Sequence, residues 1–71
     1  MKFTPIDKPY MHGFECSVDN RKAEVVRAYE SDWYFFPWRD GRQVVTGKCP
    51  LLDRAEAMRQ ARAFLRDGSL S

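Results

Sequence analysis

The chain has 71 residues, of which 44% are hydrophobic, 14% aromatic and 31% charged. This length allows one domain, and a domain this small buries only about 60% of the surface that its unfolded chain exposes. The aromatic content excludes a disordered chain, and the thin core leaves little room for an enclosed catalytic pocket. Twelve Lys and Arg against ten Asp and Glu give a net charge of +2, which permits an anionic partner without requiring one.

The sequence also limits the expected location of the protein and the chemistry of its cysteines. No apolar run approaches the roughly 20 residues that a membrane-spanning helix needs, and the first residues lack the apolar core of a signal peptide. We therefore expect a cytoplasmic protein with no membrane partner. Cys16 and Cys49 are expected to be free thiols in that reducing compartment, with a disulfide between them as the alternative.

Residues 1–13 are predicted to form an extended N-terminal arm. Pro5 and Pro9 each remove a backbone donor and favour an extended conformation of the preceding residue. Because the arm also carries large apolar side chains, we expect it to lie against the domain. These side chains belong to Phe3, Ile6, Tyr10 and Met11.

Three strands are predicted to follow the arm. Residues 14–19 alternate between apolar and polar side chains, as a half-buried strand does. A turn over residues 20–22 leads into a second strand over residues 23–29. A third strand over residues 33–38 carries aromatic side chains on both of its faces.

The dipeptide Asp40-Gly41 predicts a hairpin between the third strand and a fourth strand over residues 42–46. A loop of these two residues alone would place Pro37 opposite Val44 in a hydrogen-bonded pair, to which proline contributes no N–H. We therefore predict a three-residue loop with Gly41 in the left-handed conformation.

A C-terminal helix is predicted to begin after Asp53, a good N-cap, and to end before Gly68, a residue type that commonly terminates helices. Glu56, three residues after Asp53, completes the pattern of a capping box. The apolar side chains of this helix fall on one face, which we expect to pack on the sheet. They belong to Ala57, Met58, Ala61, Phe64 and Leu65.

These elements predict an α+β fold, in which a three- to four-stranded antiparallel sheet has one C-terminal helix packed on one face. Residues 14–67 would form a single β-β-β-β-α domain. The arm over residues 1–13 precedes it, and a tail over residues 68–71 follows it.

The two faces of the aromatic strand differ. With the three-residue loop, Trp38 faces Arg42 and shares its face with Tyr34 and Phe36, whereas the opposite face is more uniformly apolar. A single helix covers one face, and we expect it to cover the more apolar one. The other would be an open binding face, since Tyr, Trp and Arg are enriched at binding hot spots and flat rings suit stacked bases. The alternative is that the N-terminal arm folds over these rings and buries them.

Two sets of basic residues are further candidates for contacts with a partner. The first set lies at the turns of the sheet or at the rim of the aromatic face: Arg21, Lys22, Arg39, Arg42 and Arg27. The second is a helical stripe whose members lie within about 60° of one another, Arg59, Arg62 and Arg66. Such cations can contact phosphates, and the alternative for the stripe is a solvated helix face with ion pairs within the helix.

We expect no metal site, no cofactor and no catalytic residue. His12, Cys16 and Cys49 lack the paired spacing of a metal site. The sequence has no Gly-rich phosphate loop and no nucleophile motif, and His12 and Cys16 lack a third group that would orient them as base and nucleophile. The protein is therefore predicted not to be an enzyme.

Residues 33–64, WYFFPWRDGRQVVTGKCPLLDRAEAMRQARAF, run as aromatic strand, turn, short strand and capped helix. In this layout the stretch resembles the three-stranded-sheet-plus-helix DNA-binding domains at the N-termini of tyrosine recombinases and in AP2-type factors, and a bacterial cell-division activator of the same fold. The resemblance implies that the sheet enters the major groove, with Arg39 and Arg42 as phosphate or base contacts. The chain departs from that family in offering aromatic rings where the reading face is usually polar and basic.

Two functions remain open at this point. The first is nucleic-acid binding, in which the turn cations contact phosphates and Trp38 or Tyr34 stacks on a base. The alternative is a protein-interaction module that uses the same aromatic face, such as an adaptor or a phage-type inhibitor of a larger assembly. A homodimer is a variant of this second function.

Overall fold

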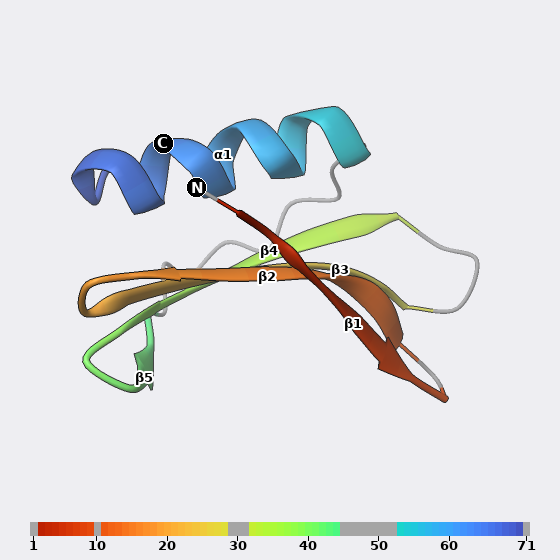
Figure 1. Ribbon diagram of the computed structural model, residues 1–71. Helices are drawn as coiled ribbons and strands as arrows, with labels where there is room; N and C mark the ends of the chain where they lie inside the picture. The colour runs from red at the N-terminus through yellow and green to blue at the C-terminus, as the bar shows by residue number, and fades with distance from the viewer. Residues whose placement is uncertain (1, 10, 29–31, 45–52, 71) are drawn as a thin grey trace.

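The computed structural model describes residues 2–9, 11–28, 32–44 and 53–70 as two packed layers. One layer is an antiparallel sheet whose strands lie side by side in chain order, and the other is a single helix across one of its faces (Figure 1). The predicted α+β fold is confirmed, with five strands in place of three or four. The elements are β1 (Thr4–Lys8), β2 (Met11–Val18), β3 (Arg21–Ala28), β4 (Trp33–Arg39), β5 (Arg42–Gln43) and α1 (Arg54–Asp67).

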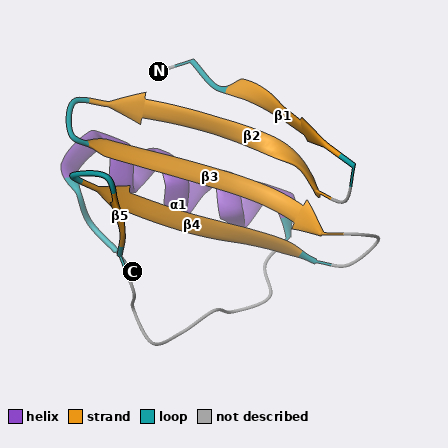
Figure 2. Ribbon diagram, turned by 90° about the horizontal axis from the view of Figure 1, so that it is seen from below, coloured by secondary structure: helices purple, strands orange, loops and turns teal. Residues whose placement is uncertain are grey.

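The N-terminal segment, predicted as an extended arm over residues 1–13, forms β1 and the start of β2 and is part of the sheet. β1 pairs antiparallel with β2 as an edge strand, in a register that places Ile6 opposite Gly13. Pro5 is compatible with this strand because an edge strand does not need every N–H for pairing. The domain is therefore β-β-β-β-β-α, and its first strand widens the sheet without folding over the aromatic face (Figure 2).

The β2–β3 hairpin is longer than predicted at both ends. β2 begins at Met11, and β3 begins at Arg21 directly after the two-residue turn Asp19-Asn20. Asp19 has a left-handed φ of 55°, which aspartate tolerates better than most residues. The predicted end of this strand at Tyr29 lies outside the described residues.

The β4–β5 hairpin has a two-residue loop, so the prediction of a three-residue loop is wrong. Asp40 and Gly41 both have positive φ values, 54° and 78°, as a type I′ turn requires. The carbonyl of Pro37 still accepts a hydrogen bond from the N–H of Val44 at 2.8 Å, so the proline costs this pair one bond and not both. That loss is tolerated because β5 ends at Gln43. The later part of the predicted fourth strand lies outside the described residues.

The helix has the predicted ends. The carboxylate of Asp53 accepts a hydrogen bond from the N–H of Glu56 at 2.7 Å, and Gly68, with a φ of 78°, donates its N–H to the carbonyl of Phe64 at 2.7 Å. The inward face of α1 is buried against the sheet. Its core is formed by Ala57, Ala61, Phe64 and Leu65 from the helix with Cys16, Ala23 and Val25 from the strands.

The helix covers the face of β4 that the sequence indicated. Phe35 packs edge-on against Phe64, with ring centroids 6.0 Å apart, and Trp33 also packs against the core. Because side chains alternate along a strand, Tyr34 and its neighbours at i+2 and i+4 lie on the other face. Within the described ranges no helix covers that face, which is the one seen in Figure 2.

Candidate functional site

We define the open sheet face as the side chains of the sheet that lie opposite α1. Cross-strand partners share a face, so the register assigns its members strand by strand. They are Thr4, Ile6 and Lys8 from β1; Met11, Gly13, Glu15 and Ser17 from β2; Lys22, Glu24 and Val26 from β3; Tyr34, Phe36 and Trp38 from β4; and Gln43 from β5.

The rings of β4 give this face its apolar character. Tyr34, Phe36 and Trp38 are all half-buried, so each keeps part of its ring accessible. The rings of Tyr34 and Phe36 are parallel within 7°, with centroids 6.0 Å apart. Beside them Val26 is only 1% exposed, although no helix covers it. The rings and Val26 therefore form an apolar strip along β3 and β4 on this face.

Trp38 is held in place from two sides. Its indole Nε1 donates a hydrogen bond to the carboxylate of Glu24 on β3. The ammonium of Lys22 lies over the ring, 4.9 Å from its centroid, in a cation–π contact. A base stacking on the outer side of this ring would compete with Lys22. A fixed ring needs little ordering when a partner binds, which favours affinity.

The charges of the open sheet face cancel. Glu15 lies directly opposite Glu24 next to the aromatic row, and the face has two lysines, Lys8 and Lys22, to balance them. A phosphate backbone laid across this face would meet two carboxylates near its centre, which oppose its binding. Sequence reasoning missed the two acidic residues, because the facing of the second strand was ambiguous. The assignment of Val25 to the helix side would have revealed that of Glu24.

Arg42, predicted to share the face of the rings, lies on the other side of the sheet, as do Arg21 and Arg39, which were predicted at the turns. Arg39 pairs with Arg21 on one side and with Arg42 on the other, so the three form a row across β3, β4 and β5. The expected pairing of Trp38 with Arg42 is therefore wrong, and Trp38 lies opposite Gln43. The two-residue loop shifts the register by one position, which moves Arg42 to the opposite face.

Two of these arginines, Arg39 and Arg21, lie at the C-terminal end of α1. Arg39 donates from Nη2 to the carbonyl of Gly68 at 3.3 Å, and its guanidinium lies 5.7 Å from the ring centroid of Phe64. Nη1 of Arg21 lies 2.8 Å from the position that a side-chain Cβ would take at Gly68. Cations near the last carbonyls of a helix stabilise it. Arg39 and Arg21 therefore have a structural role in this fold.

Arg27 completes the predicted first set of basic residues, and its register position also lies away from the rings. It pairs with His12 on β2 and with Trp33 on β4, and Trp33 packs on the helix side. Of the predicted cations, the open sheet face thus has Lys22 alone among the described residues.

A shallow hollow lies at the hairpin tips, beside Trp38. The two tips are joined, since the N–H of Asp40 donates to the carbonyl of Asn20 at 2.8 Å and Nδ2 of Asn20 donates to the carboxylate of Asp40 at 3.0 Å. The hollow has a volume of about 310 Å³ and is lined by Ser17, Asp19, Asn20, Arg21, Lys22, Trp38, Asp40 and Gly41. No sequence motif indicates it, because its two turns lie 20 positions apart.

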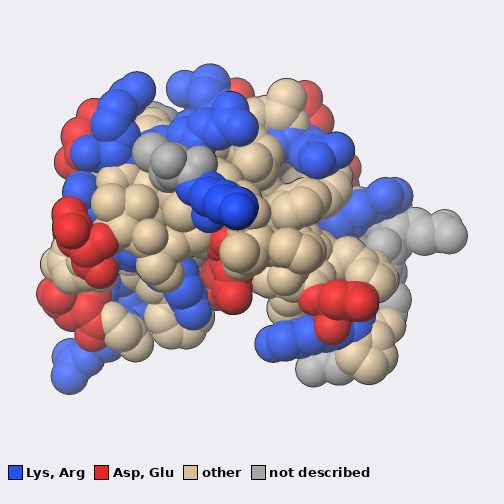
Figure 3. Space-filling view, viewed as in Figure 1, with Lys and Arg blue, Asp and Glu red and all other residues tan. Residues whose placement is uncertain are grey.

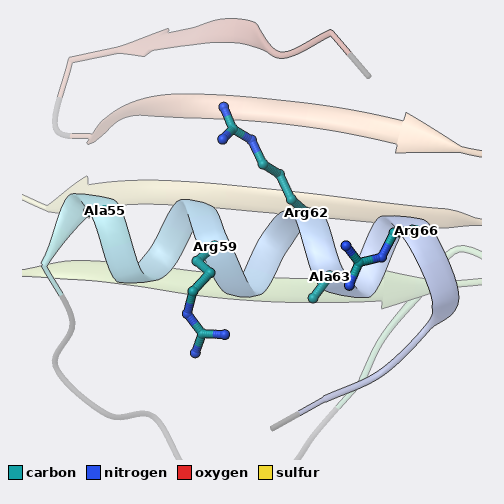
Figure 4. A pocket seen from close by; sticks show the side chains of 5 residues that line it. All are labelled: Ala55, Arg59, Arg62, Ala63 and Arg66. Carbon is teal, nitrogen blue, oxygen red and sulfur yellow. The ribbon is translucent and has the colours of Figure 1, made fainter.

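The predicted stripe on α1 exists as a separate surface. Arg59, Arg62 and Arg66 line a shallow hollow of about 290 Å³ together with Ala55 and Ala63, on the outward side of the helix (Figure 4). In a side view, Lys and Arg side chains gather along the top of the molecule over α1, with acidic side chains among them (Figure 3). This surface lies on the opposite side of the molecule from the open sheet face.

The described residues offer no metal site or catalytic pair of the types considered. No group of three or more His, Cys, Asp or Glu side chains among them could hold a metal ion. Cys16 is buried in the core, and His12 lies four positions away along β2, about 13 Å at the usual rise of a strand. Cys49 lies outside the described residues. Within the described part of the chain, no helix is both long and apolar enough to cross a membrane.

The resemblance to sheet-plus-helix DNA-binding domains is one of layout, and comparisons with known proteins add nothing to it. This chain matches no protein-family model, no curated protein sequence and no solved structure.

Proposed function

We propose that this protein is a non-catalytic docking module that binds another protein through the open sheet face. The observation that carries the proposal is the row of Tyr34, Phe36 and Trp38, half-buried on a face that no helix covers. Tyr and Trp are enriched among the residues that dominate binding energies at protein interfaces. A row of such rings beside the buried Val26 suits an apolar surface of a partner.

The charge of the face favours protein over nucleic acid as the partner there. Two lysines and two glutamates give it no net attraction for phosphates, and Arg21, Arg39 and Arg42 lie on the helix side of the sheet. Mixed charges around an aromatic centre match the polar rim and apolar core of protein interfaces. Nucleic-acid binding through this face is therefore the less supported alternative.

The size of the face sets the expected affinity. Five strands about 4.8 Å apart span roughly 20 Å, and seven residues at about 3.4 Å each span roughly 24 Å. The flat area of this rectangle, about 480 Å², is smaller than the roughly 800 Å² per partner of a standard interface. We expect a transient complex with a Kd in the micromolar range.

Capture by the immobilised protein tests the proposal. Trp38→Ala removes the fixed ring, and loss of a hot-spot tryptophan weakens binding by about 30-fold or more. Arg62→Ala is the matched control, because Arg62 lies on the outward side of α1. A protein from cells that naturally express this chain should be retained by the wild type and by Arg62→Ala, and lost with Trp38→Ala.

Circular dichroism of each variant shows whether the fold is intact, and sedimentation of the wild type shows whether the captured partner is a second copy. Retention of the same proteins by wild type and by a folded Trp38→Ala variant would contradict docking through this face. Retention of none by the wild type would contradict it as well.

A further inference from the structure

We propose that the outward side of α1 is a second binding surface, which binds the phosphate backbone of nucleic acid. We call it the arginine stripe and define it as Arg59, Arg62 and Arg66 with Ala55 and Ala63, which line the same hollow. This proposal does not depend on docking through the open sheet face, because the two surfaces lie on opposite sides of the molecule and share no residue.

The spacing of the stripe fits a nucleic-acid strand. Arg59 and Arg66 are separated by seven positions, or about 10 Å along the helix axis. Along the axis of duplex DNA, one strand has a phosphate about every 3.4 Å, so the length of the stripe is close to the axial rise of three nucleotide steps. The guanidinium group presents paired N–H donors that match two oxygens of one phosphate.

The alanines give the stripe its shape. Arg59 and Arg62 point to opposite sides of the helix axis, with Arg66 further along (Figure 4). Ala63 lies among the arginines and Ala55 lies beyond Arg59 at the start of the helix; both side chains are short, and the five residues line a hollow of about 290 Å³. A phosphate backbone can approach the helix over these alanines and have guanidinium groups on both of its sides.

Two carboxylates near the arginine stripe compete with a phosphate for its guanidinium groups. Glu56 binds Arg59 through two hydrogen bonds, one of them 2.9 Å from Nε to Oε2, and Asp67 lies 3.6 Å from Nε of Arg66. Both arginines remain largely exposed, at 62% and 71% of their side-chain surface, so a phosphate can share them. Arg62 has no ion pair with any described residue, and we expect it to make the strongest phosphate contact.

The stripe suits a phosphate backbone better than an acidic peptide. Its only uncharged lining residues are two alanines, so it offers no apolar pocket in which a peptide side chain could be recognised. Contacts from exposed arginines to a regularly charged backbone need no such pocket, because they carry no sequence information. We expect binding that is independent of sequence and sensitive to salt.

Fluorescence anisotropy with a labelled DNA duplex of about 20 base pairs tests the proposal. Three phosphate contacts predict a slope of about −2.7 for the logarithm of the association constant against the logarithm of salt concentration, or about 40-fold weaker binding between 50 and 200 mM salt. Arg62→Ala should reduce this loss to about 12-fold, because one contact fewer lowers the slope by about one unit.

Arg54→Ala is the control of equal charge. Arg54 belongs to the same helix, but its guanidinium lies over the rings of Phe14 and Trp33, 5.3 and 5.9 Å from their centroids, and not on the stripe. It should leave the salt slope unchanged, as should Trp38→Ala, which tests the other surface. An equal effect of Arg54→Ala and Arg62→Ala on the slope would overturn the proposal. Tighter binding of polyglutamate than of DNA, or no DNA binding at tens of micromolar at low salt, would overturn it too.

Discussion

The indole of Trp38 and the carboxylate of Glu24 are joined by a hydrogen bond across two neighbouring strands of the open sheet face. Glu24 lies opposite Phe36 in the register, so this bond is diagonal and draws the tryptophan ring toward the middle of the face. The ring is thereby fixed beside Phe36 before any partner arrives. The stability of the fold and the docking proposed for this face would thus depend on the same contact.

Glu24→Ala should lower the free energy of unfolding by about 1 kcal/mol, because it removes a partly exposed hydrogen bond to a charged acceptor. Glu15→Ala is the matched control, since Glu15 is the other carboxylate of the pair and like charges in opposite positions repel. We expect that variant to be neutral or slightly stabilising. Urea denaturation of both variants checks the prediction, and equal losses would contradict it.

The sequence was sufficient for the elements that depend on local patterns. The helix ends follow from Asp53 and Gly68, whose cap geometry needs only neighbouring residues. The outward position of Tyr34 follows from the alternation along β4, because the helix covers the more apolar side. Both features were predicted for the physical reasons that the structure bears out.

Local sequence patterns were insufficient to predict features that depend on the pairing of two or more segments. The missing N–H of Pro37 argues against a loop of only Asp40 and Gly41, because the pair with Val44 loses one hydrogen bond. A strand as short as β5 tolerates that loss. A shift of one position then moved Arg42 from the ring side to the helix side. The contact between Asn20 and Asp40 joins two turns and depends on the pairing of three strands, which no local pattern specifies.

The ion pair of Glu56 and Arg59 predicts a pH dependence of stability. The hydrogen bond from Arg59, and to a smaller extent that from Gln60, lowers the pKa of Glu56 from 4.5 to about 2. A carboxyl group whose folded pKa is lowered stabilises the fold above its unfolded pKa, and this stabilisation is lost as the pH falls toward the folded pKa. The contribution of Glu56 should therefore be complete above about pH 5 and should vanish between about pH 4.5 and pH 2.

Glu56→Gln measures that contribution directly, because the amide does not titrate. Thermal unfolding should show a lower Tm for the variant near neutral pH, and the difference from wild type should shrink as the pH falls through this range. A difference that stays constant down to pH 2 would show that the ionisation of Glu56 does not stabilise the fold.

Phe64 is the largest completely buried side chain among the described residues, and the core should fail without it. Phe64→Ala should lower the free energy of unfolding by about 3–5 kcal/mol. Small domains have only about 5–15 kcal/mol in total, so a large fraction of this variant should be unfolded at 37 °C. Leu70→Ala is the control, since Leu70 is 39% exposed and its loss should be nearly neutral. Thermal melts followed by circular dichroism compare the two.

Backbone angles alone suggest that substitution by alanine destabilises the protein more at Gly41 than at Gly13. We expect the opposite order. Gly41 has the left-handed φ of 78°, but no atom lies within 4 Å of an added Cβ, so Gly41→Ala should cost only the strain of that conformation, about 1 kcal/mol. An added Cβ at Gly13 would lie 2.0 Å from the carbonyl oxygen of Val25 and 2.7 Å from Cα of Val26. Both obstacles are backbone atoms of β3, which cannot move without opening the strand pair.

Gly13→Ala should therefore destabilise the protein more than Gly41→Ala, because β2 pairs along its whole length with β3, the central strand of the sheet, on which α1 packs. Hydrogen exchange should locate the difference. We expect faster exchange of the β2 and β3 amides in Gly13→Ala, and in Gly41→Ala a change confined to the β4–β5 turn. Equal stability of the two variants would mean that β2 can shift away from β3, and the register that places Glu15 opposite Glu24 would then have to be reconsidered.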